Sequence, residues 1–245
     1  MEKIKLLIVE DDEGLSFIEK TGLEDIVGGY EVSIANNGKE GLEIWESTHP
    51  DVIVADVDMP VMNGLEMVEH IRRFDNHVII IFASALTSPK DVQAGYRIGV
   101  NNYVKKPFEP EELDAHIKAL LRLREAPATN GTTDSYAIGR FVLNVKQTEL
   151  QDTLTGKTTA MTWREASILQ VLAENWGQTV RRDILLERFW HVHDDYFASR
   201  SLDVFVNKLR KMLSDDDSIS IKTIRGVGLR LGKSNCPQPL LRPCR

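Results

Sequence analysis

Residues 52–60 read Val-Ile-Val-Ala-Asp-Val-Asp-Met-Pro, a short apolar run that ends on a pair of acidic residues. An apolar run of this length, without polar alternation, is typical of a strand buried on both faces of a parallel sheet. The run at 78–83 has the same character, and further strand candidates lie at 4–9, 31–35 and 102–105. The sequence therefore predicts parallel strands, several of which end on polar residues.

Amphipathic stretches separate these strands. They lie at 14–23, 39–46, 64–74 and 89–98. A final helix is expected to begin at Pro110, since proline suits the first turn of a helix. Strand and helix alternate five times, which predicts a doubly wound α/β domain over residues 1–124, with helices on both faces of a five-stranded parallel sheet.

The second half of the chain has a different pattern. Residues 125–135 are small, polar and aperiodic, which predicts a linker. Residues 136–233 combine short strand-like pieces, helical patterns at 163–174, 183–189 and 199–213, and a closing hairpin around residues 226–228. This order predicts an α+β domain. Residues 234–245 are expected to be a tail.

Composition excludes several classes of protein. The longest nearly apolar stretch has nine residues in a chain of 245, whereas a membrane helix needs about twenty. The start of the chain lacks the pattern of a secretory signal, and both cysteines fall in the tail, so we expect a cytoplasmic protein. Residues 1–124 carry a net charge of −10 and residues 125–245 a net charge of +3, which favours nucleic acid as a partner of the second half alone.

The strand ends of the first domain bring together groups suited to phosphoryl chemistry. Glu10-Asp11-Asp12 follows the first strand, Asp56 the third, Ser84 the fourth and Lys105-Lys106-Pro107 the fifth. Carboxylates gathered at one sheet edge repel each other, and Mg²⁺ relieves that repulsion with oxygen ligands and waters. An aspartate beside such an ion can accept a phosphoryl group, which a hydroxyl and an ammonium would then hold.

This constellation resembles the receiver domain of two-component response regulators. The resemblance implies a flavodoxin-like sheet in the order 2-1-3-4-5, phosphorylation of Asp56 by a sensor histidine kinase, and Mg²⁺ held by Asp11, Asp12 and Asp56, with a backbone carbonyl from Asp58. It also implies that Ser84 and Lys106 bind the phosphate and that Tyr103 is the switch aromatic. The acidic side chain of Asp58 is a hypothesis for an altered lifetime of the phosphoryl group.

An enzyme is the rival interpretation of Asp56-Val57-Asp58. Haloacid-dehalogenase-type phosphatases use a D-x-D pair as nucleophile and general acid, but they place it on their first strand, with further acids after the lysine. Here the acidic cluster comes first and Lys106 ends the domain. The order favours a receiver, and we expect no enzyme.

The helix expected at 199–213 has two faces. Leu202, Val206, Leu209 and Leu213 form an apolar stripe at helical spacing. The opposite face carries Arg200, Val204, Asn207, Lys208 and Lys211. A helix buried on one side that offers arginine, asparagine and lysine on the other suits the major groove of DNA.

Motifs around this helix strengthen that prediction. Thr162-x-x-Glu165, Trp190, Ser199-Arg200-Ser201-Leu202-Asp203-Val204 and Thr223-Ile224-Arg225-Gly226-Val227-Gly228 resemble the OmpR-type winged-helix domain. The resemblance implies that 199–213 is the recognition helix for double-stranded promoter DNA, that Arg225 reaches a minor groove, and that the loop 191–198 is a candidate surface for RNA polymerase.

The dimer face of the family is altered in this sequence. Regulators of this type usually pair through charges, but here Asn101, Asn102 and His116 replace the expected charged residues, Val92 stands at a usually basic position, and Glu112 lacks its partner. We therefore predict a homodimer whose interface differs from the usual ion-pair network of the family or is more apolar than it. The alternative function is a pseudo-receiver, whose constitutive dimer controls DNA binding without phosphorylation.

Overall fold

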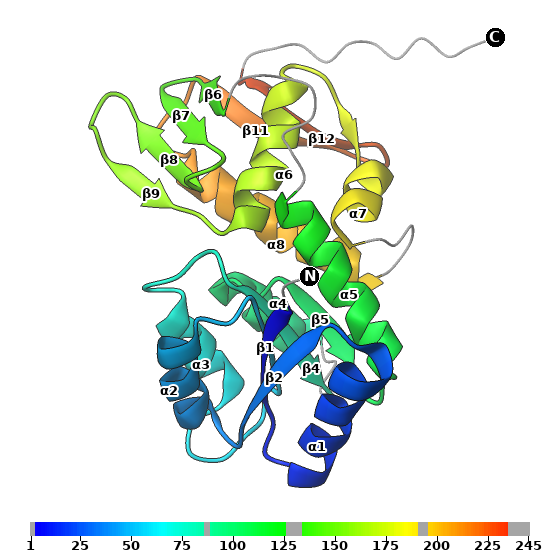
Figure 1. The fold of residues 1–245 in the computed structure, drawn as a ribbon. Coiled ribbons are helices and arrows are strands. Elements are labelled where there is room, and N and C mark those ends of the chain that lie inside the picture. Colours follow the sequence, from blue (N-terminus) through cyan, green and yellow to red (C-terminus); the bar gives the residue numbers. More distant parts are fainter. Residues whose placement is uncertain (1–2, 86–88, 126–133, 191–195, 235–245) are drawn as a thin grey trace, which may run out of the picture.

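The computed structural model describes residues 3–85, 89–125, 134–190 and 196–234. In the N-terminal domain, the described residues form a sheet of five parallel strands in the order β2-β1-β3-β4-β5 (Figure 1). The strands are β1 (Ile4–Val9), β2 (Tyr30–Ala35), β3 (Val52–Ala55), β4 (Ile79–Ser84) and β5 (Asn102–Lys105). The predicted fold class and strand order are confirmed.

Two helical layers cover this sheet, because alternate strand residues point to opposite faces. One face, with Leu6 and Ile8, packs against the helix α5 (Pro110–Glu125). The other face, with Leu7 and Val9, packs against α2 (Gly38–Thr48) and α3 (Gly64–Ile71). The helix α4 (Pro89–Ile98) packs beside α3 and presents its other side to the C-terminal domain.

The first helix differs from its predicted length. The sequence predicts one helix over 14–23, whereas α1 (Glu13–Thr21) continues into the π-helical segment η1 (Gly22–Val27). The first residue of that segment packs closely against α5, since a Cβ atom on Gly22 would lie 2.4 Å from Cγ of Pro110. Glycine is required at this contact.

Replacing Gly22 by alanine should destabilise the fold. The added methyl group collides with the Pro110 ring, and overpacking of this kind costs about 1–3 kcal/mol of unfolding free energy. Urea unfolding followed by circular dichroism measures the loss. In the double variant Gly22→Ala/Pro110→Ala most of the loss should be recovered, since the colliding ring is gone. A Gly22→Ala variant as stable as the wild type would contradict the contact.

The C-terminal domain combines two antiparallel sheets with three helices among its described residues. The first sheet contains β6 (Ser135–Ile138), β7 (Phe141–Asn144), β8 (Glu149–Asp152) and β9 (Thr158–Ala160). The second has the order β10-β12-β11, from β10 (Val180–Arg181), β11 (Ile219–Ile224) and β12 (Gly228–Lys233). The helices are α6 (Trp163–Glu174), α7 (Arg182–Trp190) and α8 (Tyr196–Met212). The predicted closing hairpin is β11–β12.

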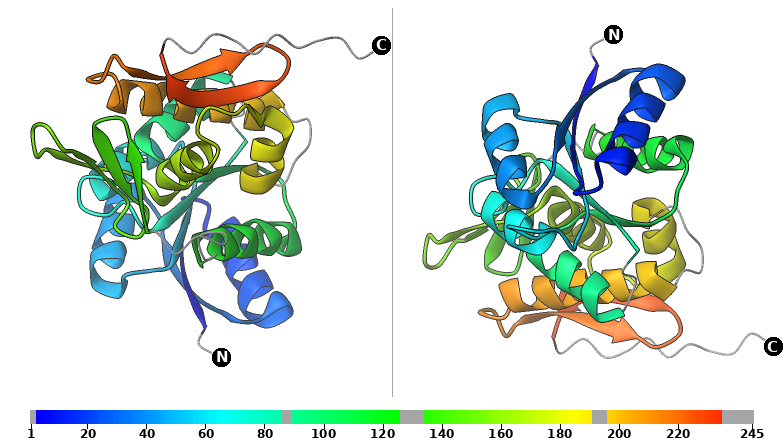
Figure 2. Two further views of the ribbon diagram at one scale, coloured as in Figure 1. Left: turned by 90° about the horizontal axis from the view of Figure 1, so that it is seen from above. Right: turned by 90° about the horizontal axis from the view of Figure 1, so that it is seen from below.

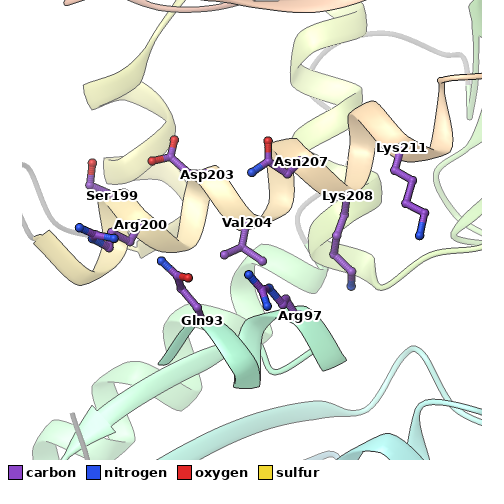
Figure 3. A pocket seen from close by; sticks show the side chains of 9 residues that line it. All are labelled: Gln93, Arg97, Ser199, Arg200, Asp203, Val204, Asn207, Lys208 and Lys211. Carbon is purple, nitrogen blue, oxygen red and sulfur yellow. The ribbon is translucent and has the colours of Figure 1, made fainter. Parts of the chain in front are cut away.

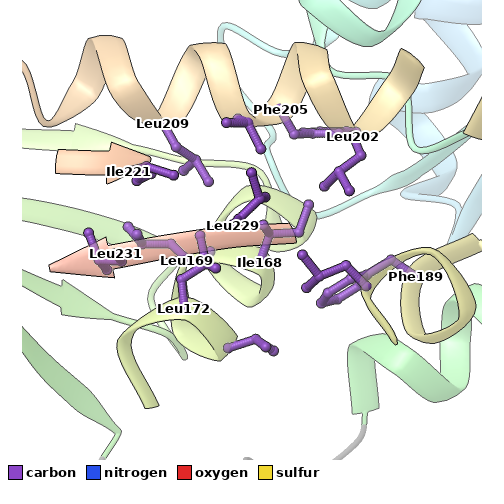
Figure 4. Packing of buried hydrophobic residues seen from close by; sticks show 14 of the residues in the cluster. Ile168, Leu169, Leu172, Phe189, Leu202, Phe205, Leu209, Ile221, Leu229 and Leu231 are labelled. Atoms are coloured by element: carbon purple, nitrogen blue, oxygen red, sulfur yellow. The ribbon is translucent and has the colours of Figure 1, made fainter. Parts of the chain in front are cut away.

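The helix α8 packs on the inner face of the β11–β12 sheet. Leu202, Phe205 and Leu209 are fully buried there against Leu229 and Leu231 (Figure 4). At the start of α6, Thr162 and Glu165 form a capping box, which satisfies free backbone N–H groups at the helix terminus. The apolar stripe predicted from the sequence is therefore the stripe that anchors α8.

Candidate phosphoacceptor and DNA-binding sites

Asp56 lies directly after β3, at the carboxyl edge of the parallel sheet. Its Oδ1 accepts hydrogen bonds from the backbone N–H of Val57 at 2.5 Å and of Asp58 at 3.4 Å. Its Oδ2 accepts a hydrogen bond from Nζ of Lys106 at 2.7 Å. The Lys106 ammonium also forms an ion pair with Glu10, which follows β1. The sheet thus brings residues 10, 56 and 106 together.

Burial sets the electrostatics of this pocket. Burial raises the pKa of the Glu10 carboxyl, while the hydrogen bond and the charge of Lys106 lower it in part. Burial lowers the pKa of the Lys106 ammonium, but its hydrogen bonds to Asp56 and Glu10 outweigh that effect and the pKa is raised. Lys106 is therefore held as a cation between two carboxylates. A fixed cation of this kind can bind a phosphoryl oxygen.

Asp12, predicted as a metal ligand, has a structural role in this conformation. Its side chain is the N-cap of α1, where Oδ1 accepts hydrogen bonds from the backbone N–H of Gly14 at 2.9 Å and of Leu15 at 3.0 Å. Glu10, which the sequence reasoning did not select, occupies the pocket instead. Asp11 is exposed directly beside it. Asp58 is exposed and lies next to Asp56 through its backbone.

The other predicted phosphate-site residues occupy neighbouring strand ends. Ser84 ends β4 and is buried, and its carbonyl oxygen accepts a hydrogen bond from the Lys106 N–H at 3.2 Å. The Lys106–Pro107 peptide bond is cis. Tyr103 lies on β5, with its ring 5.4 Å from that of Phe82 and 5.8 Å from that of Tyr96. Within the ranges described above, no three histidine, cysteine or acidic side chains form a ready-made cation site.

The predicted DNA-reading residues line a groove between the two domains. Arg200, Val204, Asn207, Lys208 and Lys211 of α8 and Gln93 and Arg97 of α4 line a space of about 770 Å³. Figure 3 shows Val204 and Lys208 pointing towards α4, whereas Asn207 lies on the other side of α8. Lys208 forms an ion pair with the buried carboxylate of Glu165 on α6. Arg225 is exposed at the turn between β11 and β12. The predicted recognition helix and the wing are thus both present.

Comparisons with known proteins match this architecture. Residues 6–118 match the response regulator receiver domain, and residues 156–231 match the C-terminal domain of transcriptional regulatory proteins. The chain is 35% identical over 230 residues to the transcriptional regulatory protein RprY of Bacteroides fragilis strain YCH46, a match that covers 94% of this chain and 95% of that protein.

The chain belongs to the response-regulator family of transcription factors. A second relative, the transcriptional regulatory protein PrrA of Mycobacterium leprae, is 36% identical over 228 residues, which is 93% of this chain and 95% of that one. A solved structure of a RitR mutant superposes with a TM-score of 0.72 at 22% identity, covering 94% of this chain and all of that one, and so shows a shared fold.

In this response regulator, the DNA-binding domain is packed against the receiver domain. Val92 and Tyr96 of α4 belong to the same buried apolar cluster as the core of the DNA-binding domain, and the Tyr96 and Phe205 rings lie 5.8 Å apart. Val204, predicted on the outer face of α8, is buried within this cluster. Figures 1 and 2 show α8 lying along α4.

A buried arginine joins the two domains. Arg164 of α6 is fully buried, and its guanidinium donates hydrogen bonds to the carbonyl oxygens of Asn101 in the receiver and Phe189 in α7. It lies over the rings of Trp163 and Trp190, whose centroids are 5.4 and 4.8 Å away. Sequence reasoning missed Arg164 and Tyr96, because nothing in their local pattern indicates contact with another domain.

Some of the residues predicted to form the dimer face already make hydrogen bonds within the chain. Asn101 is buried, and its side-chain oxygen accepts hydrogen bonds from the Ile80 N–H at 2.7 Å and from Arg72 at 3.1 Å. Asn102 is also buried, and its amide lies 3.1 Å from Nδ1 of His116. Glu112 is exposed. In this conformation both asparagine side chains are buried in contacts within the chain, and their place in a dimer face stays a prediction.

Two further predictions concern the remaining parts of the chain. Residues 191–195 of the loop predicted to contact RNA polymerase and residues 235–245 of the predicted tail lie outside the described ranges. No helix among the residues described is long and apolar enough to cross a membrane.

A second buried carboxyl group lies near the pocket and makes the stability pH-dependent. Glu19 on α1 is 5% exposed, and its Oε1 has no hydrogen-bond partner among the described residues. Burial raises its pKa to about 7; Lys106 lowers the pKa in part, and the charges of Glu10 and Asp56 raise it further. The folded protein therefore holds the Glu19 proton more tightly than the unfolded chain does.

Stability should fall as the pH rises from 4.5, the ordinary pKa of glutamate, through about 7. The contribution of Glu19 is fully present below the first value and is lost above the second, a loss of about 3 kcal/mol for a shift of this size. Urea unfolding across this range measures it. The Glu19→Gln variant should show a flatter profile, since the amide does not titrate; an equally steep profile would show that other groups carry the dependence.

Proposed function

We propose that this response regulator accepts a phosphoryl group on Asp56 from a sensor histidine kinase and binds promoter DNA through α8 and the β11–β12 wing. The observation that carries the proposal is the Lys106 ammonium, held between Asp56 and Glu10 at the end of the parallel strands. A carboxylate oxygen of Asp56 attacks phosphorus, the bond from phosphorus to the donor imidazole nitrogen breaks, and the imidazole leaves. Lys106 and Ser84 then hold the phosphoryl oxygens.

Magnesium fits this pocket. Glu10, Asp11 and Asp56 follow β1 and β3 at one sheet edge and would supply hard carboxylate oxygens, the backbone carbonyl of Asp58 would be a further ligand, and Mg²⁺ needs only one or two carboxylates besides waters and phosphate. When bound, the ion would neutralise charge on the transferred group. Asp12 is left out of this set because α1 uses its carboxylate as a cap.

A phosphorylation assay should distinguish the role of Glu10 from that of Asp12. With a small phosphodonor and Mg²⁺, the wild type should gain one phosphoryl group by mass spectrometry, and Asp56→Asn should gain none. Glu10→Gln should slow the reaction about tenfold or more, as expected for loss of one charged ligand. Asp12→Asn should react like the wild type, because asparagine also caps helices. A slow Asp12→Asn with a normal Glu10→Gln would restore the original assignment, and phosphorylation of Asp56→Asn would refute the acceptor.

The kinase is proposed to dock next to α1. Phe17 and Ile18 are 65% and 63% exposed on this helix, while the neighbouring Ser16 and Glu19 face inward. Two adjacent large apolar side chains exposed beside a reactive carboxylate suit the apolar surface of a partner helix.

Packing of α8 against α4 is proposed to hold the regulator in an inactive state. The major groove is about 12 Å wide and admits one helix, so α8 cannot enter it while α4 covers its base-reading face. DNA binding therefore requires the domains to separate. The path from the phosphate site runs through Tyr103, which contacts Tyr96, which in turn contacts Phe205 of α8.

Val92→Asp should activate DNA binding without phosphorylation. A carboxylate at this buried position of α4 is incompatible with the apolar contact to α8, so the domains should separate. We expect a larger radius of gyration by small-angle scattering and about tenfold or higher DNA affinity. The matched control is Val61→Asp, since Val61 is 81% exposed in the receiver. A separated variant without a gain in DNA affinity would refute the inhibitory role.

A homodimer on DNA is proposed to form only after this separation. Val92, one of the altered positions of the family's dimer face, and Tyr96 are already covered by α8, so a dimer that used these side chains would compete with the contact between α4 and α8. The pseudo-receiver remains the second candidate, favoured by the missing charge pairs at Asn101 and Asn102. It requires DNA affinity that is equal for Asp56→Asn and phosphorylated wild type.

A further inference from the structure

A small cavity opens on the outer face of the β10-β12-β11 sheet. It has a volume of about 130 Å³ and is lined by Trp176, Gly177, Ser220, Lys222, Arg230, Gly232 and Lys233. Three of these residues are basic and none is acidic. The cavity belongs neither to the phosphoacceptor pocket nor to the groove beside α8.

Arg230 is the central group of this cavity. It lies on β12 between Leu229 and Leu231, which point into the core, so its own side chain points to the outer face. Yet Arg230 is only 5% exposed, and its Nη2 has no hydrogen-bond partner among the described residues. A buried charge without a counterion is costly, and a buried donor without an acceptor requires a specific explanation.

Neighbouring groups increase the local positive charge. Lys222 of β11 is directly opposite Arg230 in the antiparallel ladder, an arrangement in which like charges destabilise the sheet. Its ammonium donates one hydrogen bond to the carbonyl oxygen of Ser234 and keeps two further donors. Ser220, two residues before Lys222 and on the same face, has a buried hydroxyl without a hydrogen-bond partner in the described part of the chain.

We propose that this cavity binds a small multivalent oxyanion of the phosphate class. The Arg230 guanidinium, the Lys222 ammonium and the Ser220 hydroxyl lie on the same face of β11 and β12, Lys233 also lines the cavity, and a tetrahedral anion with several acceptor oxygens can satisfy the three donors together. The volume suits an ion with its water rather than an organic ligand of drug size, for which pockets exceed about 300 Å³. Glycine at 177 and 232 leaves this space free of side chains.

The DNA proposed to bind α8 is not the source of this anion. The helix α8 packs on the inner face of the sheet (Figure 4). The cavity is lined by Arg230, Lys222 and Ser220, whose strand positions alternate with the core residues Leu229, Leu231 and Ile221 and so lie on the outer face. Ser220 and Gly232 pair at the base of the hairpin, and Arg225 lies in the turn at its other end. A duplex that contacts α8 and the wing turn therefore does not reach the cavity.

The proposed anion would link three segments of the domain. Trp176 and Gly177 follow α6, Ser220 and Lys222 lie on β11, and Arg230 and Gly232 lie on β12. Binding would tie the base of the wing hairpin to the turn after α6, and it would stabilise the domain in proportion to the anion concentration.

The test is calorimetric titration of the full chain with inorganic phosphate, with chloride as the monovalent control. Wild type should bind one phosphate that chloride does not displace at equal concentration. Lys222→Gln should weaken phosphate binding about tenfold, as for loss of one charge-assisted hydrogen bond. The matched control is Arg225→Gln, an arginine of the same hairpin outside the cavity, which should keep phosphate affinity. Asp56→Asn should also bind normally, which excludes the phosphoacceptor pocket.

Arg230→Met gives a second readout that does not depend on affinity. In phosphate-free buffer this variant should melt no lower than the wild type, because an unpaired buried charge has been removed. Added phosphate should raise the melting temperature of the wild type alone. Tighter binding of a phosphomonoester such as glucose 6-phosphate would identify an esterified ligand. Absence of phosphate binding, equal binding by Lys222→Gln, or competition by DNA would each overturn the proposal, whether or not Asp56 is phosphorylated.

Discussion

The receiver domain depends on one buried cation. Lys106 Nζ contacts the carboxylates of Asp56 and Glu10, which would otherwise repel each other at short range in a partly dehydrated pocket. The three groups meet only because β1, β3 and β5 run parallel and end at the same edge. The proposed phosphoryl group would add about two negative charges at this point, so the position of Lys106 would readjust. Lys106 directly follows β5, which carries Tyr103, and Tyr103 contacts Tyr96 of α4, so that readjustment has a short route towards α4.

The second constraint is that the side of α4 that faces α8 can hold only one partner at a time. Val92 and Tyr96 contact α8 in the closed chain, so the same side chains cannot at that moment pair with another copy. The residues that depart from the family pattern fit this use. The backbone oxygen of Asn101 accepts a hydrogen bond from Arg164, and its side-chain oxygen accepts one from Arg72. The side chain of Asn102 contacts His116. Amides that bond within the chain replace charges that would pair between chains.

Much of this molecule follows from local patterns in the sequence. Continuous apolar runs located β1 and β3 to the residue, because burial on both faces leaves no alternation to confuse with a helix. The predicted ends of the third, fourth and fifth strands located Asp56, Ser84 and Lys106 at one edge of the sheet. The sequence pattern did not show which of the three consecutive acids enters the pocket. In the structure Glu10 contacts Lys106, whereas Asp12 caps α1. The contacts between the two domains could not be predicted, because no local sequence pattern indicates them. Val204 lies on the polar face of α8, and Arg164 is a charged residue in a helix, yet both are buried.

The burial of Arg164 explains how such an interface can remain switchable. Its guanidinium contacts two carbonyl acceptors and two aromatic rings but no carboxylate among the described residues, and burial lowers its pKa to about 10. Dehydrating a charge without a counterion offsets part of the gain from packing Tyr96 against Phe205. Reversing a two-state equilibrium from 1:99 to 99:1 requires about 5.5 kcal/mol. An interface made only of apolar contacts could exceed that limit, whereas one that contains a dehydrated arginine stays closer to it, which is what the proposed separation of the domains on phosphorylation requires.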